Sequence, residues 1–201
     1  MGKYIMVWAA LVCVVFAGCG PKVMNTHAQE QGSQVAPATG KVTIGYTLTR
    51  IKGIASNQYA IWIEDSGGRY VRTLSVTDYM ARRQGWKVRQ QSLTTWVKVA
   101  DIKNTPQNDI DAVSGATPQA GKLSFVWDLK DATGKTVVAG FYVYRIEGSL
   151  LWEYTVLWTG KIRVGGAQET SKATISYFPE GADKLGRTLI SDVLAVYEPA
   201  P

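Results

Sequence analysis

The chain has 201 residues, of which 46% are hydrophobic and 19% are charged, and its formal net charge is +6. This length and composition are those of one sizeable folded domain. They exclude several classes of enzyme, because His27 is the only histidine and the chain has no Cys/His cluster for zinc, no P-loop and no dinucleotide fingerprint. His27 falls in a polar segment near the start, so a Ser-His-Asp or Cys-His arrangement cannot form in the folded part.

The first residues indicate export. Lys3 precedes an uncharged apolar stretch, residues 4–18, which is too short to span a bilayer and has the size of a secretory signal segment. The stretch closes on Phe16-Ala17-Gly18-Cys19, which resembles the lipoprotein box of bacteria. The resemblance implies cleavage before Cys19 and acylation of this residue; the alternative is an ordinary signal peptide followed by a coincidental cysteine. We predict a signal peptide at residues 1–18 and an extracytoplasmic protein that is lipid-anchored to a bacterial membrane through Cys19.

A polar segment follows this cysteine. Residues 20–40 are rich in Gln, Ala, Pro and Gly and show neither a strand period nor a helix period. We interpret residues 19–40 as a lipidated cysteine and a flexible tether, and residues 41–201 as a single domain. The other cysteine, Cys13, lies in the signal segment, so the exported part has no disulfide. Export to the cell envelope also argues against a nucleic-acid partner.

From residue 41 onward the pattern is mainly that of β-strands. Apolar residues alternate with polar ones, or form short runs rich in β-branched and aromatic residues between turn signals. The predicted strands cover residues 42–48, 59–63, 71–76, 123–129, 141–147, 153–164, 172–178 and 188–197. A series of short strands of this kind favours an all-β sandwich.

Two segments have the same layout of a tryptophan strand, an acidic turn and a glycine followed by a basic residue. They are WIEDSGGRYVRTL at residues 62–74 and WDLKDATGKTVVAGFYVYRI at residues 127–146, and both are predicted hairpins. The second resembles the immunoglobulin-like domain of flagellar hook-capping proteins, which share its Trp-Asp, Asp-x-x-Gly and Gly-x-Tyr spacing. This resemblance implies an immunoglobulin-like β-sandwich and carries no activity.

One segment, residues 78–103, interrupts the β pattern and predicts an insertion of two short helices. The first helix would span residues 78–84 with Thr77 or Asp78 as its cap, and the second would follow Ser92. The insertion also carries most of the excess positive charge, in Arg82, Arg83, Lys87, Arg89, Lys98 and Lys103. This basic cluster is either a solvated face or a docking surface for a phosphate group, an acidic partner or anionic lipid.

The stretch DAVSGATP, residues 111–118, follows the insertion. Gly115 and Ala116 leave the backbone open to another surface, and Pro118 holds Thr117 in an extended conformation. No base that could activate the Thr117 hydroxyl is visible, so we interpret this group as an acceptor and not as a catalyst. The alternative is a plain turn between the insertion and the next strand.

The residues Asp111-x-x-Ser114-Gly115-Ala116-Thr117 closely resemble the modification motif of the flavin-carrying subunits of sodium-pumping quinone reductases. In those proteins a magnesium-dependent flavin transferase splits FAD and joins FMN to the threonine through a phosphodiester. The resemblance implies that Thr117 is the covalent FMN acceptor and that Asp111, Ser114, Gly115 and Ala116 are read by the transferase. Those subunits usually continue with further hydroxyl residues, where this chain has Pro118-Gln119-Ala120.

Over nearly the whole exported part, the order of features resembles the predicted periplasmic family called domain of unknown function 2271. Four pieces carry the resemblance: residues 57–65, residues 93–96, residues 111–118 and the Trp127-Asp128 segment. Members of that family often accompany PepSY-type membrane proteins and flavin transferases, which implies a place in electron transfer at the cell envelope.

These observations favour an accessory redox protein that carries FMN and exchanges electrons with a PepSY-type membrane partner. Trp86 and Trp96 would then lie near the flavin ring and Lys87 or Arg89 near the phosphate, unless these tryptophans belong to the core and the charges are solvated. The alternative functions are a cofactor-free binding module and a scaffold lipoprotein of the envelope. A carboxylate pair for glycoside hydrolysis is not indicated, since no spacing singles out two of Glu64, Asp65, Asp109, Asp111, Asp128 and Asp131.

Overall fold

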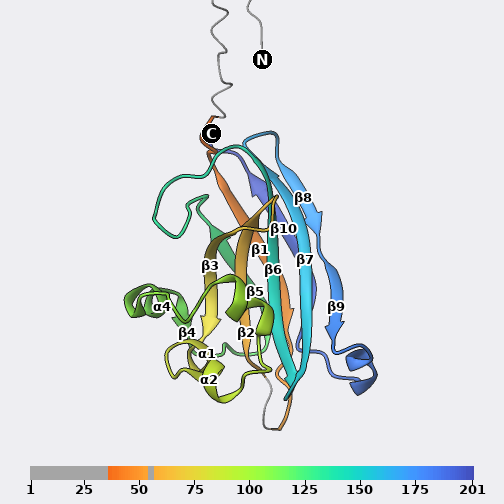
Figure 1. Ribbon diagram of the computed structural model, residues 1–201. Coiled ribbons are helices and arrows are strands. Elements are labelled where there is room, and N and C mark those ends of the chain that lie inside the picture. The colour runs from red at the N-terminus through yellow and green to blue at the C-terminus, as the bar shows by residue number, and fades with distance from the viewer. Residues whose placement is uncertain (1–35, 54–56) are drawn as a thin grey trace, which may run out of the picture. The chain divides into compact units, whose positions relative to one another are not determined.

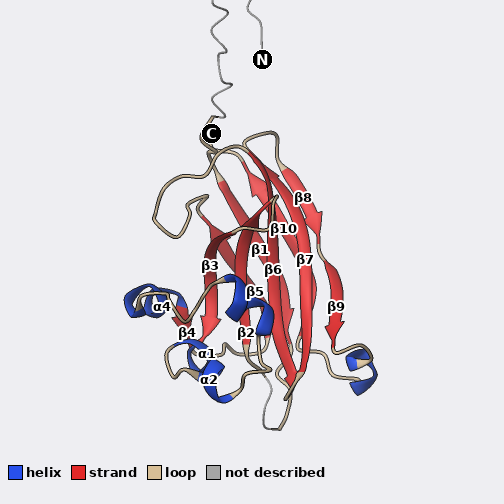
Figure 2. Cartoon of the chain, viewed as in Figure 1, coloured by secondary structure: helices blue, strands red, loops and turns tan. Residues whose placement is uncertain are grey.

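The computed structural model describes residues 36–53 and 57–201. It consists of strands with short helices beside the sheets, most of them toward the left of the view and one helical turn at the lower right (Figures 1 and 2). The strands are β1 (Lys41–Leu48), β2 (Tyr59–Asp65), β3 (Tyr70–Thr77), β4 (Ser114–Gly115), β5 (Gly121–Trp127), β6 (Gly140–Leu151), β7 (Tyr154–Val164), β8 (Glu169–Lys172), β9 (Thr174–Phe178) and β10 (Ile190–Glu198). The helices are α1 (Asp78–Ala81), α2 (Gly85–Val88), α3 (Thr94–Val99) and α4 (Gln107–Val113), and a 3-10 turn (Ala182–Leu185) precedes β10.

Two sheets face each other. One has the strand order β5-β1-β10-β8 and the other has the order β4-β3-β2-β6-β7-β9. All of the pairings are antiparallel except that of β3 with β4. The predicted all-β sandwich with a short helical insertion is therefore confirmed. The predicted strand at residues 172–178 corresponds to β9, and the structure adds β8, a strand of the first sheet that ends at Lys172 and was not predicted.

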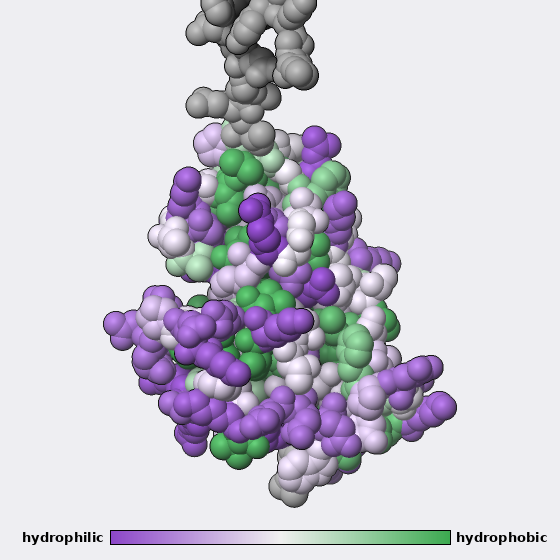
Figure 3. Space-filling view, viewed as in Figure 1, coloured by the Kyte–Doolittle hydropathy of each residue, from purple (hydrophilic) through white to green (hydrophobic). Residues whose placement is uncertain are grey.

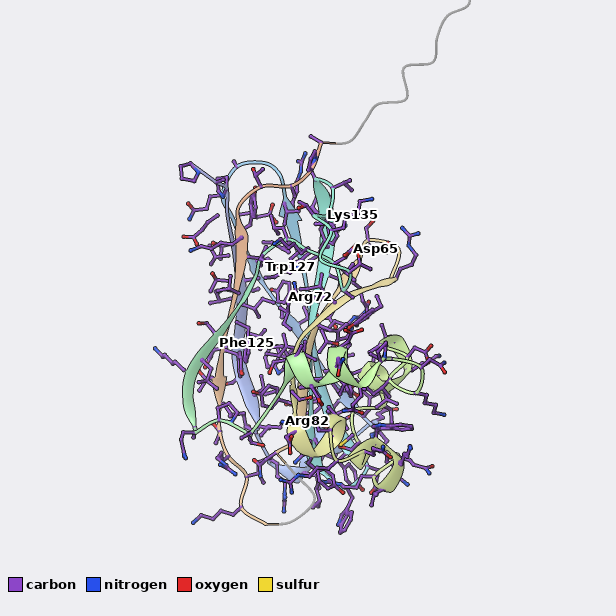
Figure 4. All side chains as sticks on the ribbon, turned by 90° about the vertical axis from the view of Figure 1, so that its left-hand side faces the viewer. Asp65, Arg72, Arg82, Phe125, Trp127 and Lys135 are labelled. Atoms are coloured by element: carbon purple, nitrogen blue, oxygen red, sulfur yellow. The ribbon has the colours of Figure 1, made fainter. Side chains whose placement is uncertain are left out.

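The main core fills the space between the sheets. It takes the inward-facing residues of β1, which alternate with more exposed ones along the strand as the sequence predicts. Trp127 and Tyr142, one from each sheet, meet edge to face with their ring centroids 5.0 Å apart. Figure 4 shows Trp127 between the sheets. Burial of these apolar surfaces is the main source of stability in a chain part without disulfides.

A second core lies on the outer face of the six-stranded sheet, beneath the helical insertion. Ala60 and Trp62 of β2 pack there against Met80 and Trp96 of the insertion. The adjacent residues of β2, Ile61 and Ile63, belong to the main core. Because β2 is covered on both faces, its residues form an apolar run and do not alternate with polar ones.

The insertion is longer and more broken than the sequence predicts. Three helices, α1 to α3, replace the two expected within residues 78–103, and a fourth, α4, extends the insertion to Val113. Ser92 does not cap a helix: its hydroxyl meets that of Ser149, while Glu147 accepts hydrogen bonds from the first N–H groups of α3. Thr77 precedes α1 as expected, but its hydroxyl donates to Gln58 Oε1 at 2.7 Å. These partners come from distant strands, which local capping rules do not consider.

The two acidic turns have the chemistry that the sequence predicts. Asp65 accepts hydrogen bonds from the N–H groups of Gly67 and Arg69, both at 2.9 Å. Asp131 accepts hydrogen bonds from Thr133 and Lys135. The pKa of the Asp131 carboxyl is lowered, mainly by the hydrogen bond from the Thr133 hydroxyl. The first turn closes a hairpin of adjacent strands, β2 and β3. The second closes only a short antiparallel bridge between Lys130 and Thr136. Beyond this bridge the chain runs from β5 of one sheet to β6 of the other, so the predicted hairpin at residues 127–146 is mainly an arch between the sheets.

The first described residues already contact the domain. Pro37 pairs with Val138, and the Ala38 N–H donates to the Val137 carbonyl at 2.8 Å. The domain's contacts thus begin before the expected boundary at Lys41. The predicted signal peptide at residues 1–18 and the lipidated Cys19 lie outside the described residues. Within the described part, no helix has the length and apolar character needed to cross a membrane.

We predict that Gly160→Ala destabilises the sandwich. A Cβ at Gly160 would overlap the buried ring of Tyr144, its partner across β6 and β7. Overpacking of this kind lowers the free energy of unfolding by about 1–3 kcal/mol, which urea denaturation would measure. The control is Gly166→Ala, where no atom lies within 4 Å of the added carbon. Equal stabilities of the two variants would contradict this packing.

Candidate functional site

The DAVSGATP stretch lies where the helical insertion returns to the sandwich. Its first residues, Asp111 to Val113, end α4, and Ser114 and Gly115 form β4. β4 runs parallel to the end of β3, with Val76 opposite Ser114 and Thr77 opposite Gly115. The chain then crosses to β5, whose first residue pairs with Leu48 at the end of β1. The stretch is therefore a helix end, a strand and a loop, and it is not a single turn.

Asp111 and Ser114 make local polar contacts. Asp111 is exposed, accepts a hydrogen bond from Gln107 at 2.8 Å and lies 3.2 Å from Arg82 Nε. The Ser114 hydroxyl donates to the Ile110 carbonyl at 2.6 Å, which satisfies one of the last carbonyls of α4. The Asp111 carboxylate thus faces outward, whereas the Ser114 hydroxyl is used to end the helix.

Gly115 and Ala116 are both exposed. A Cβ placed on Gly115 would have no atom within 4 Å. The backbone just before the threonine is therefore uncovered on its side-chain side, as the sequence predicts for a loop that another surface approaches.

Thr117 is partly exposed and belongs to neither core. Its hydroxyl donates one long hydrogen bond, 3.4 Å, to the carbonyl of Asn57. The Asn57 N–H in turn donates to the Ser149 carbonyl at 3.1 Å. A hydroxyl held this weakly at the surface keeps its lone pairs available to a reacting group from outside.

A cavity of about 350 Å³ lies beside α4, and Ala112 and Val113 of the DAVSGATP stretch are among the residues that line it. Its walls include Tyr70, Trp96 and Ile110, and its polar edge includes Arg72 and Asp109. Arg72, which lines the cavity, is labelled in Figure 4. Arg82 is labelled well below it, beside the lower helices. The volume suits a small organic ligand.

The residues of the basic cluster differ in their contacts. Arg83 pairs with Asp78 at 2.9 Å, and Arg82 lies 3.5 Å from Asp78 as well as near Asp111. Lys87 donates to the Gln84 side chain, and its ammonium lies 5.1 Å from the ring centroid of Trp86. Figure 3 shows hydrophilic side chains gathered at the lower left, where Figure 1 places α1, α2 and α4.

The two tryptophans of the insertion have different places. Trp96 is 1% exposed and donates from its indole N–H to Thr73 Oγ1 at 2.9 Å, so it is a core residue. Trp86 is partly buried at the edge of the second core. Of the two alternatives for these residues, the core therefore holds for Trp96.

Most of the acids considered for a carboxylate pair have structural partners, whereas Asp109 lines the cavity. Glu64 is buried and lies 3.0 Å from Arg145, and it accepts a hydrogen bond from the Trp62 indole at 2.8 Å. Asp65 and Asp131 shape turns, and Asp128 pairs with Arg72. Among residues 36–53 and 57–201, no group of three or more His, Cys, Asp or Glu side chains is placed to hold a metal ion.

Glu147 is a buried acid that the sequence reasoning missed. It is 1% exposed, and its two carboxylate oxygens accept the N–H groups of Thr95 and Trp96 at 3.2 and 2.9 Å. Burial raises the pKa of Glu147 to about 7, and these bonds together with Arg145 offset part of the effect. A charged residue within the apolar run of β6 was the available signal.

Comparison with known proteins gives a family. Residues 41–177 match the family described as predicted periplasmic protein (DUF2271). The chain belongs to this family. The match covers the whole site, from β1 through the DAVSGATP stretch to β9. No curated protein and no solved structure matches the chain.

The family description supports an extracytoplasmic location for this DUF2271 protein. Sequence reasoning chose the stretch but missed two of its neighbours, Asn57 and Ser149, which lie far from it in the chain. Asn57 has a positive φ. In the sequence, the dipeptide Ser56-Asn57 indicated only a polar break before the predicted strand at residues 59–63.

We predict that Glu147 makes the stability of the protein fall as the pH rises. The raised pKa means that the folded state binds this proton more tightly than the unfolded chain does. The stabilisation is complete below pH 4.5 and is lost as the pH approaches about 7. At about 1.4 kcal/mol per pKa unit, the loss is about 3 kcal/mol relative to Glu147→Gln.

Urea denaturation of both proteins at several pH values would measure this difference. Glu153→Gln, a change at an exposed acid of the following hairpin turn, is the control and leaves the pH profile unchanged. A Glu147→Gln profile parallel to that of the unaltered protein would contradict the prediction.

Proposed function

We propose that this DUF2271 protein is an accessory redox protein of the cell envelope that carries FMN covalently on Thr117. Its electrons pass to or from a PepSY-type membrane protein. Cys19 carries lipid that anchors the chain to a bacterial membrane, and residues that precede the domain serve as the tether. Of this proposal, the extracytoplasmic location has the support of the family description.

The observation that carries the proposal is the state of the Thr117 hydroxyl. It is partly exposed, it lies on a loop between β4 and β5, and its hydrogen bond to Asn57 is long at 3.4 Å. An acceptor for a transferase must present its oxygen outside the cores, and Thr117 does so. Without a neighbouring base the hydroxyl has no catalytic role of its own, which favours an acceptor.

The neighbouring motif residues also suit recognition by a flavin transferase. Asp111, Gly115 and Ala116 are exposed, so the enzyme could reach a carboxylate and an open backbone next to the acceptor. Ser114 has a supporting part, since its hydroxyl ends α4 and fixes the start of β4. The loop is bounded by strands on both sides, which limits how far Thr117 can move.

The attachment reaction balances with FAD as the co-reactant. The Thr117 oxygen attacks the phosphorus atom on the FMN side of the FAD pyrophosphate, and a new P–O bond forms. The P–O bond to the AMP half breaks, AMP leaves, and the hydroxyl proton passes to a base of the transferase. The flavin, once bound, supplies one- and two-electron chemistry. The part of this chain is to present the oxygen and to hold the loop.

A second candidate function is a cofactor-free binding or scaffold lipoprotein. The cavity of about 350 Å³ beneath α4 favours it, because mostly apolar pockets with a few polar groups are typical ligand sites. Tyr70 and Arg72 would then orient a small ligand, and the DAVSGATP stretch would serve only as a connection.

We predict that Thr117→Ala abolishes covalent flavin attachment. The protein is co-expressed with a flavin transferase, denatured and separated by electrophoresis, and flavin fluorescence that stays with the chain is measured. The unaltered protein fluoresces and Thr117→Ala is at background, because the accepting oxygen is gone. Stability should change by less than about 0.5 kcal/mol, since the deleted hydrogen bond is long.

Thr117→Ser is the matched control, because it keeps the hydroxyl and the signal. Absence of fluorescence from the unaltered protein, when the same transferase labels a known substrate, would contradict the proposed function and leave the binding role.

We further predict that Asp111→Asn slows attachment. A hydrogen bond to a charged group is worth about 1.5–3 kcal/mol, so the rate of labelling should fall about tenfold or more. The fold should persist, because the ion pair with Arg82 is at the surface. Asp109→Asn, on the same helix but outside the motif, is the control; equal labelling rates of the two variants would show that Asp111 is not read.

A further inference from the structure

Arg89 stands apart from the other arginines of the insertion. It follows α2 directly, and its guanidinium carbon lies 5.9 Å from the ring centroids of both Tyr79 and Trp152. Within the described part of the chain, two of its nitrogens, Nε and Nη2, are buried and have no hydrogen-bond partner. Arg82 and Arg83, by contrast, are paired with Asp78.

The two unpaired nitrogens form one edge of the guanidinium plane. N–H groups on this edge point in parallel and match two oxygens of one phosphate or carboxylate group. Buried donors without a partner cost about 1–3 kcal/mol, which the two rings offset only in part. Burial also lowers the pKa of Arg89, as expected for a cation without an acid beside it. The edge therefore lacks an anion.

No acid of the described chain fills this role. Glu153 follows Trp152 in the turn between β6 and β7, yet it forms no ion pair with Arg89 among the described residues. Arg89 as a whole is partly exposed, but Nε and Nη2 are themselves buried, so a ligand reaches this edge only when a neighbouring side chain moves. Among residues 36–53 and 57–201, no carboxylate therefore completes the site, and an anion bound from outside would do so.

Trp152 supplies an aromatic surface next to the unpaired edge. The indole is 52% exposed, although it contacts Arg89. Its backbone has φ +45°, a conformation that favours glycine or asparagine over a bulky side chain. A half-exposed indole in a turn is free to change its rotamer, which would uncover the nitrogen edge and offer a ring for stacking.

Hydrogen bonds connect this place with the threonine loop. Thr117 donates to Asn57, and the Asn57 N–H donates to the Ser149 carbonyl. The hydroxyls of Ser149 and Ser92 are in contact, and the Ser92 N–H donates to the Arg89 carbonyl at 2.9 Å. Figure 1 shows α2 and the β6–β7 turn at the end of the sandwich away from the C-terminus. The site lies at the same end as the loop, on the helix-covered face.

We propose that Arg89, Tyr79 and Trp152 form a binding site for a phosphate ester that carries an aromatic ring, such as a flavin nucleotide. The guanidinium edge takes two phosphate oxygens, and the Trp152 indole stacks on the ring. The site needs no bond to Thr117 and goes beyond the proposed function. The site gives the protein non-covalent affinity for a flavin nucleotide. Under the proposed function, the protein meets such nucleotides when the transferase acts on it.

The test measures non-covalent binding in the Thr117→Ala protein without any transferase. FMN, riboflavin and inorganic phosphate are titrated, and binding is followed by calorimetry and by flavin fluorescence anisotropy. FMN should bind at least about tenfold more tightly than riboflavin, which lacks the phosphate, and more tightly than phosphate, which lacks the ring. Equal affinity for FMN and riboflavin would overturn the role of Arg89.

Variants locate the site. Arg89→Gln should weaken FMN binding about tenfold or more, and Arg89→Lys, which keeps the charge but not the parallel N–H groups, should weaken it nearly as much. Trp152→Leu should weaken FMN binding and leave phosphate binding unchanged. Arg83→Gln, an exposed arginine already paired with Asp78, is the control and binds FMN as before. Unchanged binding in Arg89→Lys and Trp152→Leu would overturn the proposal, whatever happens to Arg89→Gln.

The two proposals fail separately. Loss of covalent labelling leaves the Arg89 site intact, because the titration uses a protein that cannot be labelled. Absence of FMN binding in the titration leaves attachment at Thr117 intact.

Discussion

The structure depends on the covering of both faces of β2. This strand has apolar side chains on each side, so one sheet packed on another cannot bury it completely. The helical insertion supplies the second cover, with Trp96 and Met80 against Trp62. Polar groups fix the position of this cover: Glu147 accepts the N–H groups at the start of α3, and Ser149 meets Ser92. Each of these groups would be costly if buried alone, so the insertion has one place on the sheet.

This placement determines where the DAVSGATP stretch lies. Once α3 and its neighbours are fixed on the outer face, the chain has to return to the first sheet to form β5. It does so past the edge of the second sheet, where Ser114 and Gly115 pair with the end of β3. The next residues bridge the open edge between the sheets. Thr117 is partly exposed there for a topological reason, because a segment that crosses from one sheet to the other lies outside both cores.

The sequence was sufficient for features that follow local rules. The alternation along β1 and the acidic turns at Asp65 and Asp131 were predicted, because they depend on neighbouring residues alone. The family resemblance was also recognised from the order of short motifs.

Features that depend on distant residues could not be predicted. The breaks between the helices of the insertion occur at Gln84 and Leu93, which adopt left-handed backbone conformations that tertiary packing imposes. The arch between β5 and β6 has the sequence of a hairpin, and only its packing between two sheets reveals the difference. In the site, the contact of Thr117 with Asn57 joins residues far apart in the chain, and no local pattern marks it. The roles of Thr117 and its motif neighbours stay predictions.

Some cations of the basic cluster are paired with acids and others are not, and this difference limits where an anionic partner can bind. Arg82 and Arg83 already face Asp78 and Asp111, so a docking anion would have to displace an acid from them. In the described part of the chain Arg89 has no such competitor, so an anion that reaches it displaces no acid there. The first described residues and the C-terminal strand end lie at the opposite end of the sandwich, since Lys41 pairs with Glu198 there while Leu48 pairs with Gly121 near the loop. A partner that approaches Thr117 and Arg89 therefore meets the end of the domain away from the first described residues and from the end of β10.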